Sequence, residues 1–413
     1  MNSKLVFLVL AFLSILLAIR LVTYFASINY YADDQVITFE TQLQSQPKIS
    51  ARGQRVSLIL PNSQRITVLL TLNPLLSYGD KIKIEGKVEY FQVENGNQIA
   101  SMNYPQFRVL KKGTETNLMY KVRENIINFF NSSFNPRYSS LMLGIVFGIK
   151  QEMDSQFYLD LQKVGLLHVI AASGMNITMV GGFFLGLFSL IFKRQLAIIL
   201  SILGILLYAF MAGFEPSIVR ASIMGILVFS AQLIGRQSSG FLGLFGAAFV
   251  MLFLNPSLVF DIGFQLSFMA TLGLIYLRPI FFLNKKIKKV IKKSIIGEDL
   301  VTTTTAQLFT LPILLVNFGS YSLVSILVNG LVLWTVPILM AIGGLASILG
   351  LIIEPIGRAL SYLSLPFLLY FEKIAELFSG FGGQFELKNL PVLIIFGYYC
   401  LLISIILFFR RKE

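Results

Sequence analysis

The chain has 413 residues, of which 55% are hydrophobic and only 13% are charged. It contains several apolar runs of about twenty residues, the length that crosses a bilayer as a helix, and this predicts a polytopic α-helical membrane protein with about ten spans. Cys400 and His168 are the only residues of their types, so the sequence excludes an intrachain disulfide and a Cys/His zinc cluster. We expect no metal and no cofactor. The net charge of +13 is compatible with an acidic partner, but in membrane proteins it more often reflects cytoplasmic loops.

The first apolar run covers residues 4–26 and is interrupted by Arg20. The alternative to a membrane helix is a cleaved signal peptide, but no small-residue cleavage site follows a short apolar core. Tyr24 and Phe25 suit an anchor at the membrane surface. We therefore predict that residues 1–26 form an uncleaved N-terminal transmembrane helix.

The composition then changes, and residues 33–112 have the pattern of a small all-β domain. Its alternating segments lie at 49–60, 65–72 and 81–91. They are separated by turn signals at Pro61-Asn62, Asn73-Pro74, Gly79-Asp80 and Asn95-Gly96. The segment SYGDKIKIEGKVEYF resembles a strand of an OB-type barrel that bends at a central glycine. Barrels of this type often bind single-stranded nucleic acid, but the domain has ten basic and seven acidic side chains. A structural or docking role and DNA contact both stay open.

Residues 113–165 are predicted to form amphipathic or interfacial helices. Segment 116–130 has apolar side chains on one side, while Lys121, Arg123 and Glu124 face away. This pattern is typical of a helix lying in the membrane interface. Segment 139–150 is apolar but too short to span, so it is either re-entrant or buried.

Residues 166–413 form the predicted transmembrane domain. Its predicted spans are 166–192, 195–213, 217–234, 240–254, 257–283, 299–318, 322–351, 364–378 and 391–409. Segment 364–378 carries Glu372, Lys373 and Glu376, so an interfacial position is the alternative for it.

Basic residues orient these spans. If every span crosses, Lys193-Arg194, Arg236, the six lysines of 285–293 and the basic residues at 410–412 lie on one side. The positive-inside rule makes that side cytoplasmic. We therefore expect a bacterial cytoplasmic membrane protein whose termini are cytoplasmic and whose β domain is extracytoplasmic.

Polar side chains within the apolar segments point to function. The segment DIGFQLSFMATLG places Asp261 and Gln265 on one face, and such groups usually face a bundle interior or a wet cavity. By the predicted topology, His168, Arg220 and Asp261 enter their spans at similar depth near the outer side, which indicates a polar vestibule. The candidate lining residues are His168, Ser173, Asn176, Arg220, Asp261, Gln265, Gln307 and Asn329.

Each candidate also has a structural interpretation. Arg220 and Asp261 are compatible with a buried ion pair that neutralises itself. His168 is compatible with helix packing, and Gln307 and Asn329 with hydrogen bonds between helices. The lysines of 285–293 suit a topology determinant in contact with anionic lipid, with docking of a motor or nucleic acid as the minority interpretation.

Four separated segments resemble, in order and spacing, the signature segments of the ComEC competence family. They are GLLHVIAASGMNITMV at 165–180, EPSIVRASIM at 215–224, NPSLVFDIGFQLSFMATLGLI at 255–275 and TAQLFTLPILLVNFGSYSLVSILVNGLVLWTVP at 305–337. The β domain resembles that family's N-terminal module, so the resemblance covers nearly the whole chain. It implies an inner-membrane channel that passes one strand of DNA into the cytoplasm during natural transformation.

Two features depart from the family pattern. Asn176 stands where members often have a second histidine, which puts a role for paired histidines in doubt. The sequence also lacks the metallo-β-lactamase-like domain with which many members continue. We therefore expect no enzymatic activity from this chain, and expect a nuclease and a DNA receptor to be separate partners. Because no GxxxxGK[ST] loop is present, we also expect the energy to come from a separate cytoplasmic helicase-like motor.

A DNA channel is the function that the sequence favours, with single-stranded DNA and the lipid bilayer as its partners. A transporter of another solute or of lipid is the alternative, because it also needs buried polar groups. A membrane-embedded hydrolase using His168 with Ser173 or Asp261 is a distant third, since the sequence has no nucleophile elbow and no metal motif. The oligomeric state and the pore route are not predicted.

Overall fold

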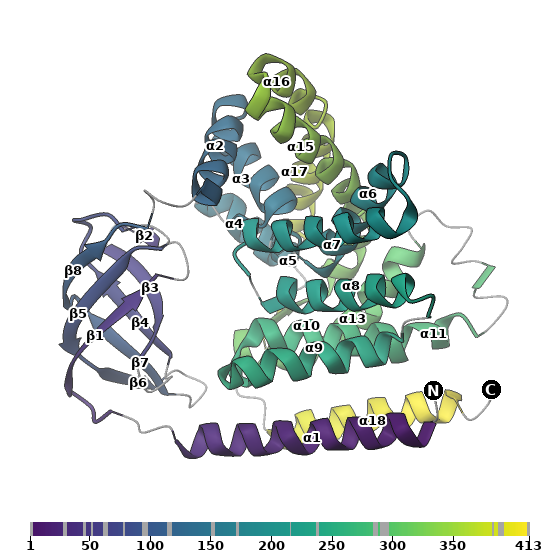
Figure 1. Ribbon diagram of the computed structural model, residues 1–413, viewed down its shortest axis with the longest axis horizontal. Coiled ribbons are helices and arrows are strands. Elements are labelled where there is room, and N and C mark those ends of the chain that lie inside the picture. Colours follow the sequence, from purple (N-terminus) through teal and green to yellow (C-terminus); the bar gives the residue numbers. More distant parts are fainter. Residues whose placement is uncertain are drawn as a thin grey trace. The chain divides into compact units, whose positions relative to one another are not determined.

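A computed structural model describes residues 3–27, 31–43, 47–50, 53–60, 65–76, 79–92, 98–113, 118–149, 153–170, 173–214, 216–236, 239–283, 288–289, 297–381, 384–386 and 392–410. The chain divides into two compact units. The first comprises Met1–Glu124 with Leu252–Ser257, and the second comprises Asn125–Met251 with Leu258–Glu413. Figure 1 labels most of the helices and strands.

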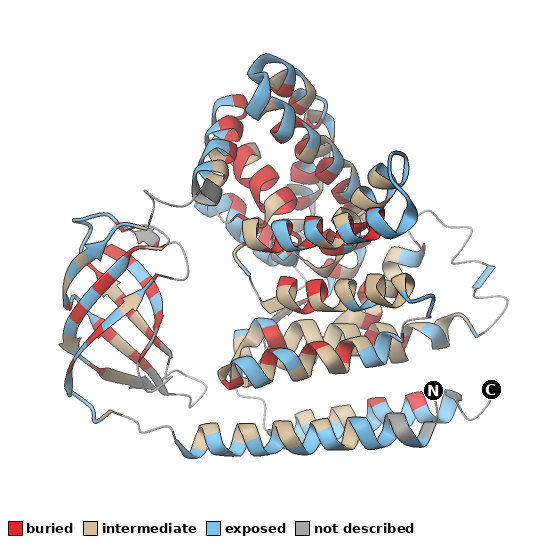
Figure 2. Cartoon of the chain, viewed as in Figure 1, coloured by how far each residue is buried: buried red, intermediate tan, exposed pale blue. Residues whose placement is uncertain are grey.

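Helix α1 (Ser3–Ala26) opens the first unit and covers the first predicted span. Its 24 residues extend about 36 Å at the α-helical rise, which exceeds the hydrocarbon thickness of about 30 Å. Large apolar side chains along it, such as Phe7, Phe12 and Val22, are exposed (Figure 2). Such a surface suits contact with lipid chains.

The rest of the first unit holds a small β domain. Its strands are β1 (Val36–Gln42), β2 (Lys48–Ser50), β3 (Gly53–Ile59), β4 (Arg65–Leu70), β5 (Lys81–Lys87), β6 (Glu89–Gln92), β7 (Gln98–Asn103) and β8 (Gln106–Lys111). One sheet has the order β1-β5-β8, and the other has the order β2-β3-β4-β7-β6. The described strand pairs are antiparallel except for β4 and β7, which are parallel.

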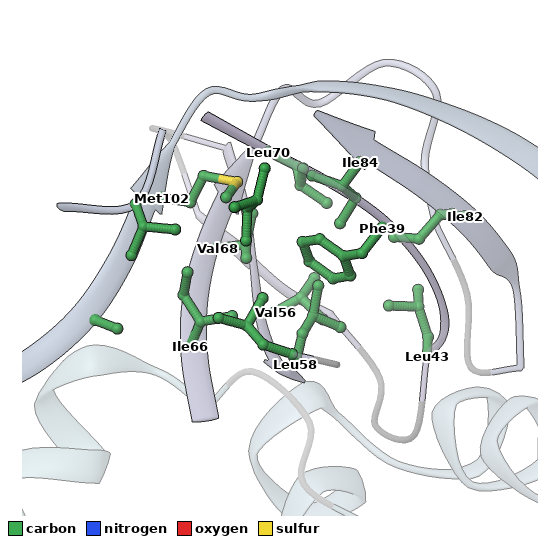
Figure 3. Close-up of a cluster of buried hydrophobic side chains, with 14 of the residues drawn as sticks. Phe39, Leu43, Val56, Leu58, Ile66, Val68, Leu70, Ile82, Ile84 and Met102 are labelled. Atoms are coloured by element: carbon green, nitrogen blue, oxygen red, sulfur yellow. The ribbon is translucent and has the colours of Figure 1, made fainter. Parts of the chain in front are cut away.

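Alternation along the strands builds the core of this domain. In β5, Ile82 and Ile84 point inward while Lys81 and Lys83 are exposed, as the period of two requires. The buried side chains from both sheets meet in one apolar cluster (Figure 3). At Gly86, where the sequence predicts a bend, a Cβ would lie 2.5 Å from the Cβ of Pro105, so any larger residue would force the chain apart.

Gln54 fixes a turn onto this core. Its side chain is fully buried, and its Nε2 donates to the carbonyl oxygens of Thr71 at 2.8 Å and Pro74 at 2.9 Å. The Gln54 Oε1 accepts from the backbone N–H of Leu76 at 2.8 Å. This turn contains the predicted signal Asn73-Pro74, whereas the predicted turns at 61–62 and 95–96 lie outside the described residues.

The second unit is helical. Its helices before the C-terminal third are α2 (Leu118–Ser133), α3 (Pro136–Phe147), α4 (Ser155–Lys163), α5 (Leu167–Ile170), α6 (Gly174–Ser189), α7 (Arg194–Met211), α8 (Pro216–Leu233), α9 (Gly240–Leu254), η1 (Pro256–Phe260), α10 (Ile262–Tyr276) and α11 (Arg278–Phe281). The remaining helices are α13 (Gly297–Phe318), α14 (Val324–Val332), α15 (Thr335–Ile352), α16 (Glu354–Tyr362), α17 (Leu365–Ser379) and α18 (Val392–Arg410). Short strands β9 (Ser320–Ser322) and β10 (Gln384–Glu386) pair with each other.

Two apolar clusters hold these helices together. The first joins α6, α7 and α8 through residues such as Ile177, Tyr208 and Ile218. The second joins α13 and α18 to the end of α10, through residues such as Phe309, Ile406 and Leu277. These clusters fix the helices that carry most of the predicted polar residues.

Seven helical segments of the described chain are long and apolar enough to cross a membrane. They are Phe7–Ala26, Leu167–Ser189, Arg194–Met211, Pro216–Leu233, Ile262–Phe281, Gly297–Phe318 and Thr335–Ile352, and Gly240–Leu254 and Ile394–Phe409 are shorter apolar helices. This confirms the predicted class of protein with several apolar helices and a small β region. Of the lysine-rich loop at 285–293, only residues 288 and 289 are described.

Three predicted spans have a different form in the structure. Segment 322–351 is two helices, α14 and α15, with a turn at Leu333 and Trp334. Segment 166–192 contains α5 and α6, because Ser173 adopts an extended backbone as the N-cap of α6. Segment 257–283 begins with the 3₁₀ turn η1 and ends in the separate helix α11. Apolar composition predicts a span but does not show where its hydrogen bonding is interrupted.

Candidate functional site

Arg220 lies inside the second unit on α8, where it is only 7% exposed. Its guanidinium carbon is 5.9 Å from the ring centroid of Phe268 on α10, a cation–π distance. Among the described residues the guanidinium makes no ion pair, and its Nε is buried without a hydrogen-bond partner. A buried guanidinium without a carboxylate is costly, so this position calls for an explanation.

The N-terminus of α6 adjoins this guanidinium. A Cβ at position 174 would lie 3.0 Å from Arg220 Nη2, so the absence of a side chain at Gly174 permits the approach. Ser173, the N-cap residue, donates its hydroxyl to Asn176 Oδ1 at 2.9 Å instead of capping the backbone. The side chains of α6 and α8 therefore meet at the first turn of α6.

Asn176 has a structural position in this arrangement. It is 1% exposed, and its Nδ2 donates to the carbonyl oxygen of Ile145 on α3 at 2.9 Å and to the hydroxyl of Tyr208 on α7 at 3.0 Å. With the Ser173 hydroxyl on its Oδ1, the amide joins three elements. Asn176 thus fixes α6 against α3 and α7.

Asp261 does not form an ion pair with Arg220. It is the N-cap of α10, where its Oδ1 accepts from the backbone N–H of Phe264 at 2.9 Å. Phe268, against which Arg220 lies, is seven residues further along α10, which corresponds to about 10 Å of helical rise. Gln265 donates its Nε2 to the carbonyl oxygen of Val259 at 2.7 Å, so it fastens η1 to α10.

His168 lies on the short helix α5 and is exposed. Its Nδ1 is 2.9 Å from the carbonyl oxygen of Gly165. A carbonyl only accepts, so Nδ1 carries the proton, and in the neutral ring Nε2 is left as an acceptor. No described contact joins His168 to Arg220 or Asp261.

A second polar group lies between α13 and α14. Gln307 donates its Nε2 to Ser325 Oγ at 2.8 Å and accepts from the Tyr321 hydroxyl at 2.6 Å. Asn329, one turn after Ser325, is fully buried, and neither its Oδ1 nor its Nδ2 has a hydrogen-bond partner in the described part of the chain. The sequence candidates are therefore divided among at least two places in the bundle.

The sequence analysis missed an ion-pair network centred on Arg137 of α3. Arg137 bonds Glu372 of α17 at 2.5 Å, Glu376 at 3.2 Å and Asp154, the N-cap of α4, at 2.8 Å. The Tyr138 hydroxyl donates to Glu372 at 2.6 Å. Helix α17 is not among the candidate membrane spans. The bonds from Arg137 and Tyr138 explain how the carboxylate of Glu372 on this helix can be buried, with only 7% of the residue exposed.

The network shifts the pKa values of its members. The hydrogen bond to Glu372 raises the pKa of Arg137, and the hydrogen bond from Arg137 lowers the pKa of Asp154. Burial opposes ionisation of Glu372, but the hydrogen bonds from Tyr138 and Arg137 outweigh it and lower its pKa. Burial and the bond to Glu372 raise the pKa of Tyr138 to about 12. The favoured state has charged carboxylates around one guanidinium.

Phe268 and Tyr208 are further residues that the sequence did not point to. Phe268 follows Gln265 by three residues and Asp261 by seven, so the helical spacing that identified those two extends to it. Gly174 lies within the SGMN sequence, but nothing local indicates that an arginine approaches it. The described residues contain no group of three His, Cys, Asp or Glu side chains placed to hold a metal.

Comparison with known proteins gives a consistent result. The chain is 29% identical to ComE operon protein 3 of Bacillus subtilis over 231 residues, which is 55% of this chain and 29% of that protein. It is 28% identical to an uncharacterized protein of Aquifex aeolicus over 157 residues, or 36% of this chain and 37% of that protein. The matches thus span well under half of either relative, and no solved structure gives a significant match.

The competence protein family model matches residues 145–412, which is more than half of the chain. The matched region contains α5, α6, α8, α10, α13 and α14, the helices that carry the polar residues described above. The chain therefore belongs to the competence protein family.

Proposed function

We propose that this protein forms the path by which single-stranded DNA crosses the bacterial cytoplasmic membrane during natural transformation. Family membership supports a role in DNA uptake for competence. The observation that carries the channel proposal is Arg220, a buried guanidinium without a carboxylate among the described residues of a membrane-length helix.

Physical chemistry supports this role for Arg220. A single strand carries one negative charge per nucleotide, so an apolar bundle must offer cationic or polar groups that replace water. Phe268 presents an aromatic ring beside the guanidinium, and aromatic rings are the surfaces on which bases stack. One arginine without a fixed counter-ion attracts phosphate without binding it too tightly for release.

The test compares Arg220→Ala with Arg236→Ala, which removes an exposed arginine just beyond the end of α8. We expect Arg220→Ala to abolish single-strand uptake while membrane abundance stays near normal, because no ion pair is broken. Arg236→Ala is expected to reduce uptake little. Loss of the Arg220→Ala protein from the membrane, in proportion to the loss of uptake, would show a structural role for Arg220 instead.

The β domain offers a second contact for DNA. Lys83 of β5 and Arg108 of β8 face each other in register and are both exposed. Lys81, the preceding lysine of β5, forms an ion pair with Glu40 of β1 at 2.8 Å. Like charges directly opposite destabilise a sheet, and an anionic strand lying across it would compensate them. We expect Lys83→Gln with Arg108→Gln to weaken single-strand binding, whereas Arg55→Gln on the other sheet does not. Equal binding of single-stranded DNA by the two variants would show that this face of the β domain does not contact DNA.

We propose that the β domain is extracytoplasmic and that both termini are cytoplasmic. In a Cys400→Ser background, a cysteine at exposed Thr38 is expected to react with impermeant reagents from outside, and one at Lys288 is not. The reverse labelling pattern would contradict this orientation.

We further propose that this chain has no enzymatic activity, and that a receptor, a nuclease and a cytoplasmic motor act as separate partners. Purified protein is then expected to show no metal-dependent cleavage of DNA, because the sequence offers one histidine and one cysteine as soft ligands. Cleavage that His168→Ala abolishes would overturn this part of the proposal.

A further inference from the structure

The first turn of α6 has backbone amides that its own side chain does not cap. The first N–H groups of any helix lack an intrahelical acceptor, and the positive end of the helix dipole lies there. The usual partner is the N-cap hydroxyl, but Ser173 makes no such bond and donates to Asn176 Oδ1 instead. Gly174, the first residue of α6, leaves this end of the helix open on the side of Arg220.

Arg220 supplies an independent observation at the same place. Its side chain is more than nine-tenths buried, and its Nε has no hydrogen-bond partner among the residues that the structure describes. Its Nη2 lies 3.0 Å from the place that a Cβ of residue 174 would take. A cation and a helix N-terminus repel each other slightly, so the arrangement is unfavourable while it is empty. An anion placed between them would satisfy both.

We propose that the first turn of α6 and the guanidinium of Arg220 form a binding site for one phosphodiester group of a nucleic-acid strand. This inference rests on the proposed function and specifies where the strand is held. The backbone amides of Gly174 and Met175 would donate to the phosphate oxygens, with the guanidinium of Arg220 opposite them. Helix N-termini bind phosphate in this way, and charge-assisted bonds from arginine add to the affinity.

The surroundings favour a nucleic-acid strand over a lipid headgroup. Asn176, two residues into the helix, is bonded to α3 and α7, so protein covers that side of the first turn of α6. Phe268 presents its ring to the same guanidinium, which gives a base next to the bound phosphate a surface for stacking. A lipid headgroup would need neither feature.

The experiment uses the full chain, purified and reconstituted in nanodiscs, with a short fluorescent oligothymidylate as the probe. Gly174→Ala adds one methyl group against Arg220 Nη2, whereas Gly182→Ala, on the same helix, adds it where no atom lies within 4 Å. We expect Gly174→Ala and Arg220→Gln to weaken binding by about tenfold or more, as loss of a charge-assisted contact implies. Gly182→Ala is expected to bind as the unaltered protein does.

Two competitors identify the ligand. An oligothymidylate with neutral methylphosphonate linkages is expected to compete poorly, because it lacks the charge that the site recognises. Anionic phospholipid that competes as well as the oligothymidylate would overturn the nucleic-acid assignment. Thermal unfolding of each variant, measured alongside, is expected to show that Gly174→Ala is folded, since alanine favours the helix.

Different results would contradict the phosphodiester site and the proposed channel function. Equal binding by Gly174→Ala and Gly182→Ala would overturn the site, even if cells still import DNA. Weakened binding by Gly174→Ala, with normal uptake in cells, would support the site and contradict the channel function.

Discussion

Two arginines of the helical unit have opposite surroundings, and of the two Arg137 is half-buried and Arg220 is buried. Arg137 is held by three carboxylates, and its guanidinium carbon lies 5.0 Å from the ring centroid of Phe157. Arg220 has an aromatic ring at 5.9 Å but no carboxylate partner in the part of the chain that the structure describes. Among the described residues, carboxylates therefore neutralise the half-buried guanidinium at α3 but not the buried guanidinium at α8.

This difference separates a structural role from a functional one. A guanidinium that bonds carboxylates on other helices holds those helices together, and removal of one partner leaves an unpaired charge. A buried guanidinium without carboxylates destabilises the folded protein, and binding of an anionic ligand or substrate offsets that loss. The two positions should accordingly respond in opposite ways to substitution.

The largest effect is expected at Glu372. Glu372→Ala should lower the free energy of unfolding by about 3 kcal/mol, because it leaves Arg137 and Tyr138 without their main partner. Denaturant unfolding in detergent measures this loss. The control is Glu354→Ala, whose exposed pair with Arg358 is expected to contribute less than about 1 kcal/mol. Similar losses for the two variants would contradict the structural role of the network.

An opposite and smaller effect is expected at Asn329. Its amide is fully buried with both polar atoms unpaired among the described residues, and each unpaired atom is unfavourable. Asn329→Leu, which has similar volume, should raise the free energy of unfolding by about 1–2 kcal/mol. Unfolding of the two proteins side by side tests this, and a loss of stability would show that the amide has a partner.

The smallest effect is expected from acid. The folded-state pKa of Glu372 lies below its ordinary value of 4.5, so its contribution to stability is complete above about that pH. The contribution is lost as the pH falls through the lowered pKa, and Asp154 behaves in the same way below 3.8. Unfolding measured between neutral and acidic pH should show this loss, and Glu372→Gln should reduce it. An unchanged acid dependence in that variant would assign the loss to other groups.

Hydrophobic length and alternation predicted the class of protein. The apolar helices and the small β region follow from side-chain periods that are visible in any short window. Strands β1, β7 and β8 were not predicted individually, because their apolar residues are few and mixed with polar ones. The pairing of β4 with β7 could not be predicted from local patterns either, because β5 and β6 lie between them in the sequence.

The polar residues show where sequence reasoning ends. Their presence in apolar segments was predictable from composition, but their partners depend on long-range packing. Arg137 and Glu372 are 235 positions apart, and no local pattern joins them. Arg220 and Asp261 have opposite charges and similar predicted depth, yet the cap of α10 retains Asp261 about two turns from the ring that Arg220 contacts.

The strand order of the β domain constrains how it can be made. Its first strand β1 and its last strand β8 pair with the two edges of β5. The nascent chain cannot complete this sheet until Lys111 has left the ribosome, and until then β5 exposes an edge open to wrong pairing. If the domain is extracytoplasmic, as we propose, the sheet is complete only after the entire segment has been exported, and export then precedes folding of this domain.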